Sequence, residues 1–224
     1  MINAVLFDLF ETLITESPVL PTRASSLGAA LGLQPEAFRV EWKTWRPRVV
    51  LGQVSFTDAL TEISRNLTGR VDTAAVQRIR TQRIREKAAV YARIDEEVTA
   101  LIAELRHQGV GLAVISNCFS EDVLAWPACP LAREFQCTAF SFAEGVAKPD
   151  SEIYRRAISR LGVEPATAVF IGDGGDDELA GAALAGLRAF RAVWFVRDRP
   201  VQPSGAVSPE LANRRDVLTL VTAG

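Results

Sequence analysis

Two carboxylate-bearing turns stand out in this sequence, because each follows an apolar run. Asp8 follows Ala4-Val-Leu-Phe7, and Asp173 follows Ala168-Val-Phe-Ile171-Gly172. After Asp173 the chain continues as Gly-Gly-Asp-Asp-Glu, so several acids share one Gly-rich turn. A carboxylate that leaves an apolar strand is unfavourable unless its charge is compensated, and clustered acids repel one another unless they hold a hard cation. The acid-rich turn therefore predicts a cation site.

A hydroxyl, an amide and an ammonium group lie on two further turns. Ser116 and Asn117 follow the apolar run 110–115, a pattern that is also typical of an ordinary strand-to-helix turn. Lys148 stands just before Pro149-Asp150, which is a helix start signal. A lysine at a helix N-terminus opposes the helix dipole, so it needs another reason to be there. We expect all four turns at the carboxyl edge of a parallel sheet, where open α/β sheets place their sites.

The segments that would position these turns alternate between strand and helix. Continuous apolar runs predict buried parallel strands over 4–7, 110–115, 168–171 and 189–193. Helical patterns cover 96–106, 150–161 and 176–184. Strand and helix alternating in this way predict right-handed βαβ units, and hence an α/β fold with a doubly wound parallel sheet.

Residues 15–90 differ from the rest, because they show helical periodicity and no buried strand. Helices are expected over 24–33, 35–45, 56–67 and 72–90. We interpret 15–90 as an inserted α-helical bundle, a cap domain, and 1–14 with 91–224 as the core domain. Trp42 and Trp45 are candidates for lining a pocket. The last helix is rich in arginine and lysine, which favours a solvated face, with steering of an anionic substrate as the alternative (Arg78, Arg80, Arg83, Arg85 and Lys87).

The composition of the chain argues against several classes of function. The chain has 224 residues, 48% of them hydrophobic, and a formal net charge of −2, which gives no reason to expect nucleic acid as a partner. No apolar run approaches the ~18 residues of a membrane span. Three cysteines without a CxxC pair predict reduced thiols in a cytoplasmic protein. The only histidine, His107, is expected at a solvated helix end, so His-based metal sites and Ser-His-Asp triads are excluded. We assign no role to the tail 197–224.

The ordered set Asp8, Ser116, Lys148 and Asp173/Asp177 resembles the four-motif signature of the haloacid dehalogenase-like (HAD) hydrolase superfamily. The resemblance spans nearly the whole chain, and the helical block stands where that family inserts its first-position cap, as in subfamily I. It implies a Rossmann-like core with a central first strand. It also implies a hydrolase that acts on a small, anionic substrate between core and cap.

The same resemblance implies roles for individual residues. Asp8 would attack the electrophile and form a covalent ester, which is an aspartyl-phosphate if the substrate is a phosphate. Ser116 would hold a phosphoryl oxygen, and Lys148 would neutralise the charge that develops in the transition state. Backbone N–H groups of the turns at Leu9, Phe10 and Asn117 would contribute to substrate binding.

The resemblance also implies a metal. Mg²⁺ suits a few carboxylates completed by water and substrate oxygens. The predicted ligands are the carboxylates of Asp8, Asp173 and Asp177 and the carbonyl of Phe10. Asp176 has the same chemistry as Asp177, and the spacing from Asp173 favours Asp177.

Phe10 departs from the phosphatases of this family, which have a second aspartate there to protonate the leaving group and activate water. General acid–base help of this kind is worth ~10²–10⁴-fold. The related 2-haloacid dehalogenases have an aromatic residue at this position and work without metal, so Phe10 favours a dehalogenase. The acid cluster favours phosphate chemistry, and we weight it more. A weakly active, ligand-binding member is the third alternative, and Glu11 is a candidate substitute for the missing acid.

Overall fold

The computed structural model describes residues 1–16, 24–197 and 208–222. Within them, six strands form one parallel sheet in the order β3-β2-β1-β4-β5-β6, which confirms the predicted α/β class. The strands are β1 (Ala4–Phe7), β2 (Gly111–Ser116), β3 (Cys137–Phe140), β4 (Ala168–Gly172), β5 (Arg188–Ala192) and β6 (Glu210–Leu211).

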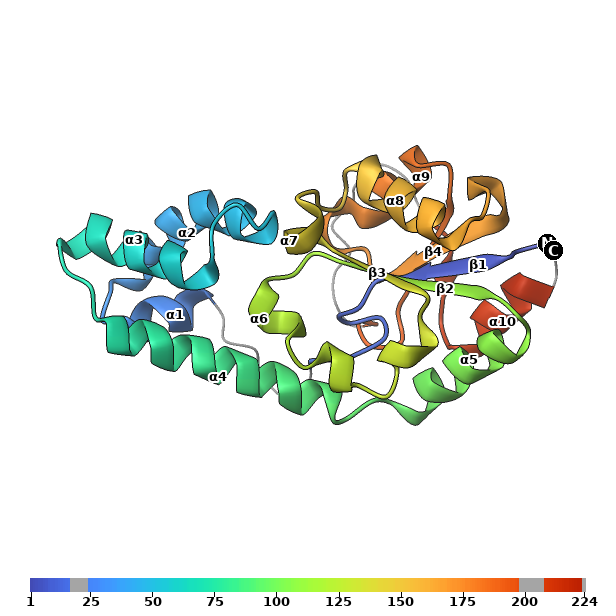
Figure 1. Ribbon diagram of the computed structural model, residues 1–224, viewed down its shortest axis with the longest axis horizontal. Coiled ribbons are helices and arrows are strands. Elements are labelled where there is room, and N and C mark those ends of the chain that lie inside the picture. Colours follow the sequence, from blue (N-terminus) through green and yellow to red (C-terminus); the bar gives the residue numbers. More distant parts are fainter. Residues whose placement is uncertain (17–23, 198–207, 223–224) are drawn as a thin grey trace.

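The central strand β1 sends alternate side chains to opposite faces of the sheet, as the period of two in a strand requires. Val5 and Phe7 belong to an apolar cluster with residues of α5 (Glu96–His107) and α10 (Arg215–Thr222). Ala4 and Leu6 belong to a second cluster, with residues of α8 (Ser151–Leu161) and α9 (Glu178–Leu184). Helices therefore cover both faces, as Figure 1 shows, and the sheet is doubly wound.

The order of the strands reverses between β1 and β4. From β1 the chain adds β2 and β3 on one side and then returns to place β4 on the other side of β1. Asp8 follows β1 and Asp173 follows β4, so both lie at this reversal. In open α/β sheets, ligands bind at the carboxyl ends of the strands at such a point.

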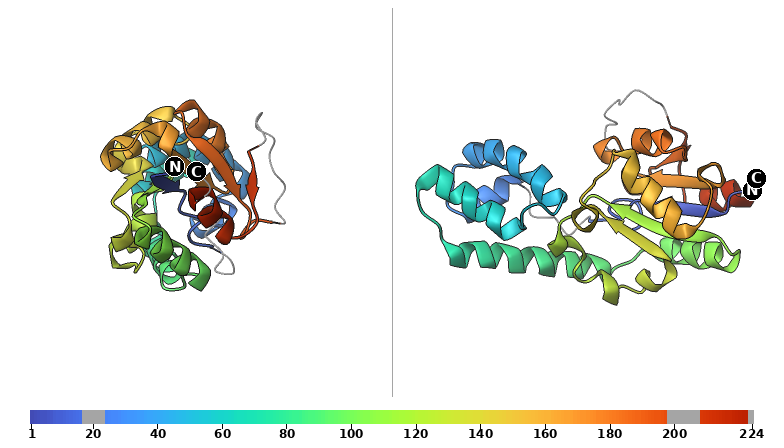
Figure 2. Two further views of the ribbon diagram at one scale, coloured as in Figure 1. Left: turned by 90° about the vertical axis from the view of Figure 1, so that its right-hand side faces the viewer. Right: turned by 45° about the horizontal axis from the view of Figure 1, so that its top comes forward.

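Four helices form one end of the molecule: three gather away from the sheet, and the longest runs from them back toward it (Figure 1). They are α1 (Ala24–Ala30), α2 (Pro35–Val50), α3 (Phe56–Thr68) and α4 (Thr73–Tyr91). They share an apolar cluster that includes Phe38, Trp42 and Phe56, and Phe119 from the sheet side joins it. In the right view of Figure 2, α5 and α10 lie at the end opposite this bundle. The division into a core domain and a cap domain at residues 15–90 stays a prediction.

Side-chain caps explain where two of these helices begin. The Ser55 hydroxyl accepts a hydrogen bond from the backbone N–H of Asp58 at 3.0 Å, at the start of α3. The Asp72 carboxylate does the same for Ala75 at 2.9 Å, at the start of α4. Both caps satisfy N–H groups that have no partner inside the helix.

The structure differs from the sequence analysis in three respects. We expected a helix end at residue 45, but α2 runs past Pro47 to Val50, because Val49 and Val50 pack into the helical cluster. The edge strands β3 and β6 were not predicted, since each is short and partly exposed. The tail also has a structural role: β6 extends the sheet and Val217 of α10 is buried against it, while 198–207 lie outside the described residues.

Short elements complete the fold. They are α6 (Ser120–Val123), α7 (Ser141–Glu144) and single 3₁₀ turns over Trp126–Ala128, Ala132–Glu134, Pro165–Thr167 and Gly175–Asp177. None of the helices described is both long and apolar enough to cross a lipid bilayer.

Candidate active site

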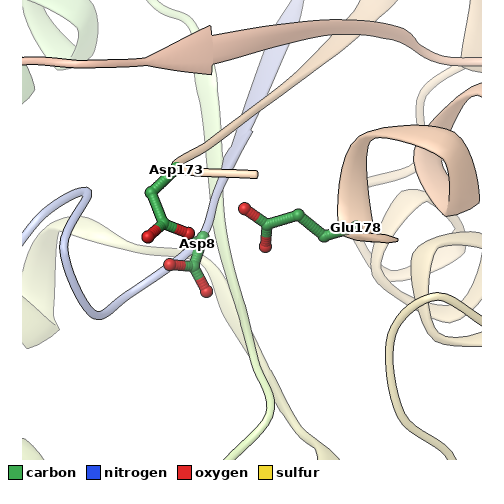
Figure 3. A group of neighbouring side chains, drawn as sticks. All are labelled: Asp8, Asp173 and Glu178. Carbon is green, nitrogen blue, oxygen red and sulfur yellow. The ribbon is translucent and has the colours of Figure 1, made fainter. Parts of the chain in front are cut away.

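Three carboxylates meet at the carboxyl edge of the sheet. Asp8 follows β1, Asp173 follows β4 and Glu178 begins α9; each offers an oxygen within 4.8 Å of the others. Figure 3 shows Asp8 and Asp173 at their strand ends, with Glu178 reaching across from the helix. Asp8 and Glu178 are buried and Asp173 is partly buried. Carboxylate oxygens in this number are the ligands that Mg²⁺ prefers.

The Lys148 ammonium lies between two of these acids. It donates hydrogen bonds to Asp8 and, at 2.5 Å, to Oε2 of Glu178, and its side chain is almost fully buried. When all three carboxylates are ionised, their charge exceeds that of the one ammonium by two. In a buried setting such an excess is strongly unfavourable, and a divalent cation matches it.

The surroundings of Glu178 are shaped to hold its carboxylate. The Gly174 N–H donates to Oε1 of Glu178 at 2.9 Å. A Cβ on Gly172 would lie 2.1 Å from the same oxygen, so a side chain at that position would displace the carboxylate. Glycine at position 172 therefore leaves room for the Glu178 carboxylate, and the three carboxylates together are the hard oxygen donors that suit a magnesium ion.

Burial and mutual repulsion perturb the protonation of these acids. Desolvation raises the pKa of Asp8 to about 6, although the Lys148 charge opposes the shift. Desolvation likewise raises the pKa of Glu178 to about 8, again against Lys148. Burial alone would lower the pKa of Lys148, but the charges of Asp8 and Glu178 raise it well above its usual range. In the metal-free protein, protons therefore take part of the role that a cation would fill.

We predict that Glu178→Gln flattens the pH dependence of stability in the metal-free protein. The folded state holds a proton on Glu178 up to about pH 8, whereas the unfolded chain releases it near 4.5. Stability is therefore fully present below the unfolded value and is lost as the pH rises toward 8, by up to about 1.4 kcal/mol per pH unit. Urea unfolding in chelator at about pH 5.5 and about pH 8 measures the difference.

The matched control for this prediction is Asp177→Asn. Asp177 is the exposed neighbour of Glu178, so its variant should keep the wild-type pH dependence. A Glu178→Gln protein with the wild-type slope would show that Glu178 is not held protonated as described.

The structure places Asp177 apart from the three carboxylates, and Glu178 stands where we expected Asp177. Asp176 and Asp177 both have left-handed backbones, with φ of 51° and 55°, and both are exposed. These two residues turn the chain, so the helix starts at Glu178 rather than at Asp176. Side chains in a helix tilt toward its N-terminus, and Glu178 therefore points back at the strand ends. Had we placed the start of this helix at residue 178 instead of 176, the sequence would have pointed to Glu178 as the acid that faces the strand ends.

Ser116 and Asn117 lie at the end of β2, as expected. Ser116 is buried, at the strand end next to β1. The Asn117 side chain contacts the Lys148 backbone: its Nδ2 donates to the Lys148 carbonyl at 2.8 Å, and its Oδ1 accepts from the Lys148 N–H at 2.8 Å. We had expected only the backbone of Asn117 to take part, so this clamp on Lys148 is a finding of the structure.

The turn after Asp8 carries Leu9, Phe10 and Glu11. Leu9 is buried, and the Phe10 ring lies 3.7 Å from the Lys87 ammonium. Glu11 is buried with a left-handed φ of 62°, and its carboxylate accepts from the Thr15 hydroxyl at 3.2 Å and the Glu16 N–H at 3.0 Å. These contacts give Glu11 a role in shaping the turn.

The arginine-rich face of α4 is only partly solvated. Arg78 and Arg85 are exposed, as expected. Arg83 instead pairs with buried Asp122 at 2.6 Å, and buried Lys87 pairs with Glu16. Packing against α6 turns these two cations inward. Trp42 is buried between aromatic rings of the helical cluster, while Trp45 is partly exposed.

Comparison with known proteins identifies relatives among hydrolases. A family model described as haloacid dehalogenase-like hydrolase matches residues 2–186. A phosphoserine phosphatase from Thermus thermophilus is 32% identical over 146 residues, which cover 61% of this chain and 57% of that protein. A glyceraldehyde 3-phosphate phosphatase from Methanopyrus kandleri is 27% identical over 202 residues, which cover 85% of this chain and 84% of that protein. The match thus spans little more than half of the first of these relatives.

A solved structure shows the same fold. A 2-haloacid dehalogenase from Pseudomonas syringae superposes with a TM-score of 0.70 at 20% identity, covering 100% of this chain and 99% of that one. At this level of identity, the likeness concerns the fold.

Proposed function

The chain belongs to the haloacid dehalogenase-like hydrolase family, and from this premise we propose that it is a Mg²⁺-dependent phosphatase of small organic phosphates, with Asp8 as the nucleophile. The observation that carries the proposal is the grouping of three carboxylates: oxygens of Asp8, Asp173 and Glu178 lie within 4.8 Å of one another, and one ammonium group, that of Lys148, contacts two of these acids. A substrate phosphate adds more negative charge at this edge, so a divalent cation is needed for both.

Asp8, Asp173 and Glu178 would hold the ion, and the carbonyl of Phe10 remains a predicted fourth ligand. Bound Mg²⁺ would supply positive charge to the phosphoryl oxygens. Asp177 keeps its predicted role only if the turn 173–178 rearranges, and we therefore propose Glu178 in its place.

The residues of this chain perform two displacements. In the first, an Asp8 carboxylate oxygen forms a bond to phosphorus while the bond to the leaving oxygen breaks, which gives an aspartyl-phosphate. Lys148 and the Ser116 hydroxyl stabilise the charge on the transferring group. In the second, water attacks phosphorus, the bond to Asp8 breaks, and phosphate is released with the carboxylate regenerated.

Phe10 limits this chemistry, because its ring cannot supply a proton to the leaving oxygen. The leaving group must then take its proton from water, which favours substrates whose alcohols are acidic. The same observation favours the second candidate, a 2-haloacid dehalogenase, because a departing halide needs no proton. In that reaction Asp8 would displace halide from carbon, and water would then hydrolyse the ester.

The helices α1–α4 would act as the family's first-position cap and cover the substrate during turnover. The three cysteines are free thiols, which fits the proposed location in the reducing cytoplasm.

One assay separates these candidates. Purified protein is given an activated aryl phosphate or a 2-chloro acid, each with Mg²⁺ and with chelator. The proposal predicts phosphate release that requires Mg²⁺. Chloride release that survives chelator would establish the dehalogenase instead, and Mg²⁺ binding without turnover of either would favour a ligand-binding member.

We predict that Phe10→Asp speeds hydrolysis of phosphate esters with poorly acidic alcohols by about tenfold or more. The new carboxyl would stand two residues after the nucleophile and could donate a proton. The gain should stay below the ~10²–10⁴-fold of a tuned acid, because Lys87 beside it favours the ionised form. Phe10→Asn is the control, since it is polar but cannot exchange a proton. Equal rates for the two variants would contradict an acid–base gap at this position.

A further inference from the structure

Asp176 is connected to the backbone of Lys148 through one side chain. Its Oδ2 accepts a hydrogen bond from Nδ2 of Asn117 at 3.0 Å. Nδ2 also donates to the Lys148 carbonyl, and Oδ1 of Asn117 accepts from the Lys148 N–H, both at 2.8 Å. Asn117 thus holds both backbone polar groups of the residue whose ammonium contacts Asp8 and Glu178.

The carboxylate of Asp176 favours one of the two orientations of the Asn117 side-chain amide. An asparagine amide has two ends of nearly equal shape, one that donates and one that accepts. A carboxylate only accepts, so Asp176 favours the orientation in which Nδ2 faces it. In that orientation Oδ1 faces the Lys148 N–H, as the structure shows. The reversed amide would set acceptor against acceptor at Asp176 as well as at the Lys148 carbonyl, so Asp176 reinforces the orientation that the Lys148 backbone favours.

The backbone conformation at Asp176 is one that glycine could also adopt, so the side chain is what distinguishes aspartate at this position. Its φ of 51° and ψ of 32° lie in the left-handed region, which aspartate adopts more readily than most residues with a Cβ. Glycine adopts this conformation without strain. An aspartate here therefore brings a carboxylate that the turn itself does not need.

The same carboxylate oxygen faces the helical end of the molecule. Nη2 of Arg46, on α2, lies 3.8 Å from Oδ2 of Asp176, and both side chains are about half exposed. Exposed ion pairs contribute little to stability, so this contact can break and re-form at little cost.

We propose that Asp176 is a positioning residue for Lys148, and that Arg46 acts on Lys148 through it. When α2 approaches the sheet, Arg46 holds the Asp176 carboxylate, Asp176 orients the Asn117 amide, and Asn117 holds the Lys148 backbone. The placement of the ammonium between Asp8 and Glu178 then depends on the position of α2. The functional part of this proposal rests on the proposed role of Lys148, whereas the structural coupling does not.

The first test follows hydrogen exchange at the Lys148 amide, which requires no substrate. Asp176→Gly removes the carboxylate and suits the left-handed backbone, so it should fold. It is expected to speed exchange of the Lys148 amide by about tenfold or more, and Arg46→Ala by a smaller factor in the same direction. Asp177→Gly is the matched control, because it makes the same change at the next residue, where φ is 55°, and should leave this amide unchanged.

The second test is kinetic and uses the activated aryl phosphate. Asp176→Gly should lower kcat by about tenfold with KM changed by less than about threefold, because Lys148 stabilises charge in the transition state. Asp176→Asn keeps an acceptor for Asn117 and should recover most of kcat. Arg46→Ala should have a smaller effect that disappears when Asp176 is already glycine. Arg39→Ala, on the same helix, should behave as wild type.

The outcomes separate this proposal from the proposed function. Unchanged exchange at Lys148 in Asp176→Gly would overturn the coupling, whatever the activity. Additive effects of Arg46 and Asp176 would overturn the part that involves α2. If the wild-type protein hydrolyses no phosphate ester, the proposed function fails, and the exchange rates still decide whether Asp176 positions Lys148.

Discussion

Asp8→Asn is expected to lower turnover by about four orders of magnitude or more, because it removes the only group that we propose to form the covalent intermediate. The amide has the shape of the carboxylate but is not a nucleophile at neutral pH. The fold should persist, since Lys148 keeps its contact with Glu178 at 2.5 Å. Initial rates with an activated aryl phosphate at saturating Mg²⁺ measure the loss.

Asp8→Glu provides the second arm of this experiment. It restores a carboxylate but displaces it by one methylene, and should also be inactive because the attack requires close alignment. Thermal unfolding of both variants checks that they are folded. Residual activity within tenfold of wild type in folded Asp8→Asn would remove Asp8 from the mechanism.

Lys148→Met is expected to destabilise the protein by about 3–5 kcal/mol at pH 8, since it leaves buried carboxylates without their ammonium. Asp8 and Glu178 lie in contact with this group, and both are largely buried. At about pH 6 the loss should be smaller, because a carboxyl can bind a proton instead. Activity should fall by about 10²–10³-fold through lost stabilisation of transition-state charge.

Urea unfolding at the two pH values, with and without Mg²⁺, measures this effect. Lys43→Met is the control, because Lys43 is an exposed lysine of α2 and its replacement should change stability by less than about 0.5 kcal/mol. Mg²⁺ should recover part of the lost stability by binding to the folded state. A Lys148→Met protein as stable as wild type at pH 8 would show that Asp8 and Glu178 do not depend on this ammonium.

Much of the site could be predicted from sequence, because the strands of a parallel sheet are continuous apolar runs. The run before Asp8 and the run before Asp173 each end at a polar residue, and both strands proved to be central neighbours. The acids were therefore placed at one edge without knowledge of the structure. Lys148 was recognised because its charge is unfavourable at a helix N-terminus, and the structure shows two carboxylates beside it.

The remaining features depend on backbone detail that residue types do not show. Glu178 replaced Asp177 in the group because two left-handed residues delay the helix start. The inward turn of Arg83 and Lys87 depends on acids of the packed α6 and on Glu16, which periodicity within one helix cannot reveal. The link from Asp176 to Lys148 joins residues 28 positions apart through a third, Asn117, and no local pattern predicts such a bridge.

Phe10 stands where the family's phosphatases have an acid, and this difference sets what chemistry we expect of the site. The proposed nucleophile Asp8, the Lys148 ammonium and the acidic group lie together, while the residue two positions after Asp8 is an aromatic ring beside Lys87. We therefore expect a hydrolase whose bond-breaking machinery is complete and whose proton transfers rely on solvent.

The central claim is that Asp8 carries a covalent intermediate, and rapid acid quench during turnover tests it most directly. The protein is mixed with an activated aryl phosphate and Mg²⁺, quenched within milliseconds, digested and analysed by mass spectrometry. We predict one phosphoryl group on the peptide that contains Asp8, absent in Asp8→Asn and in chelator. Turnover with no modification of this peptide, or with the phosphoryl group on another residue, would contradict the account.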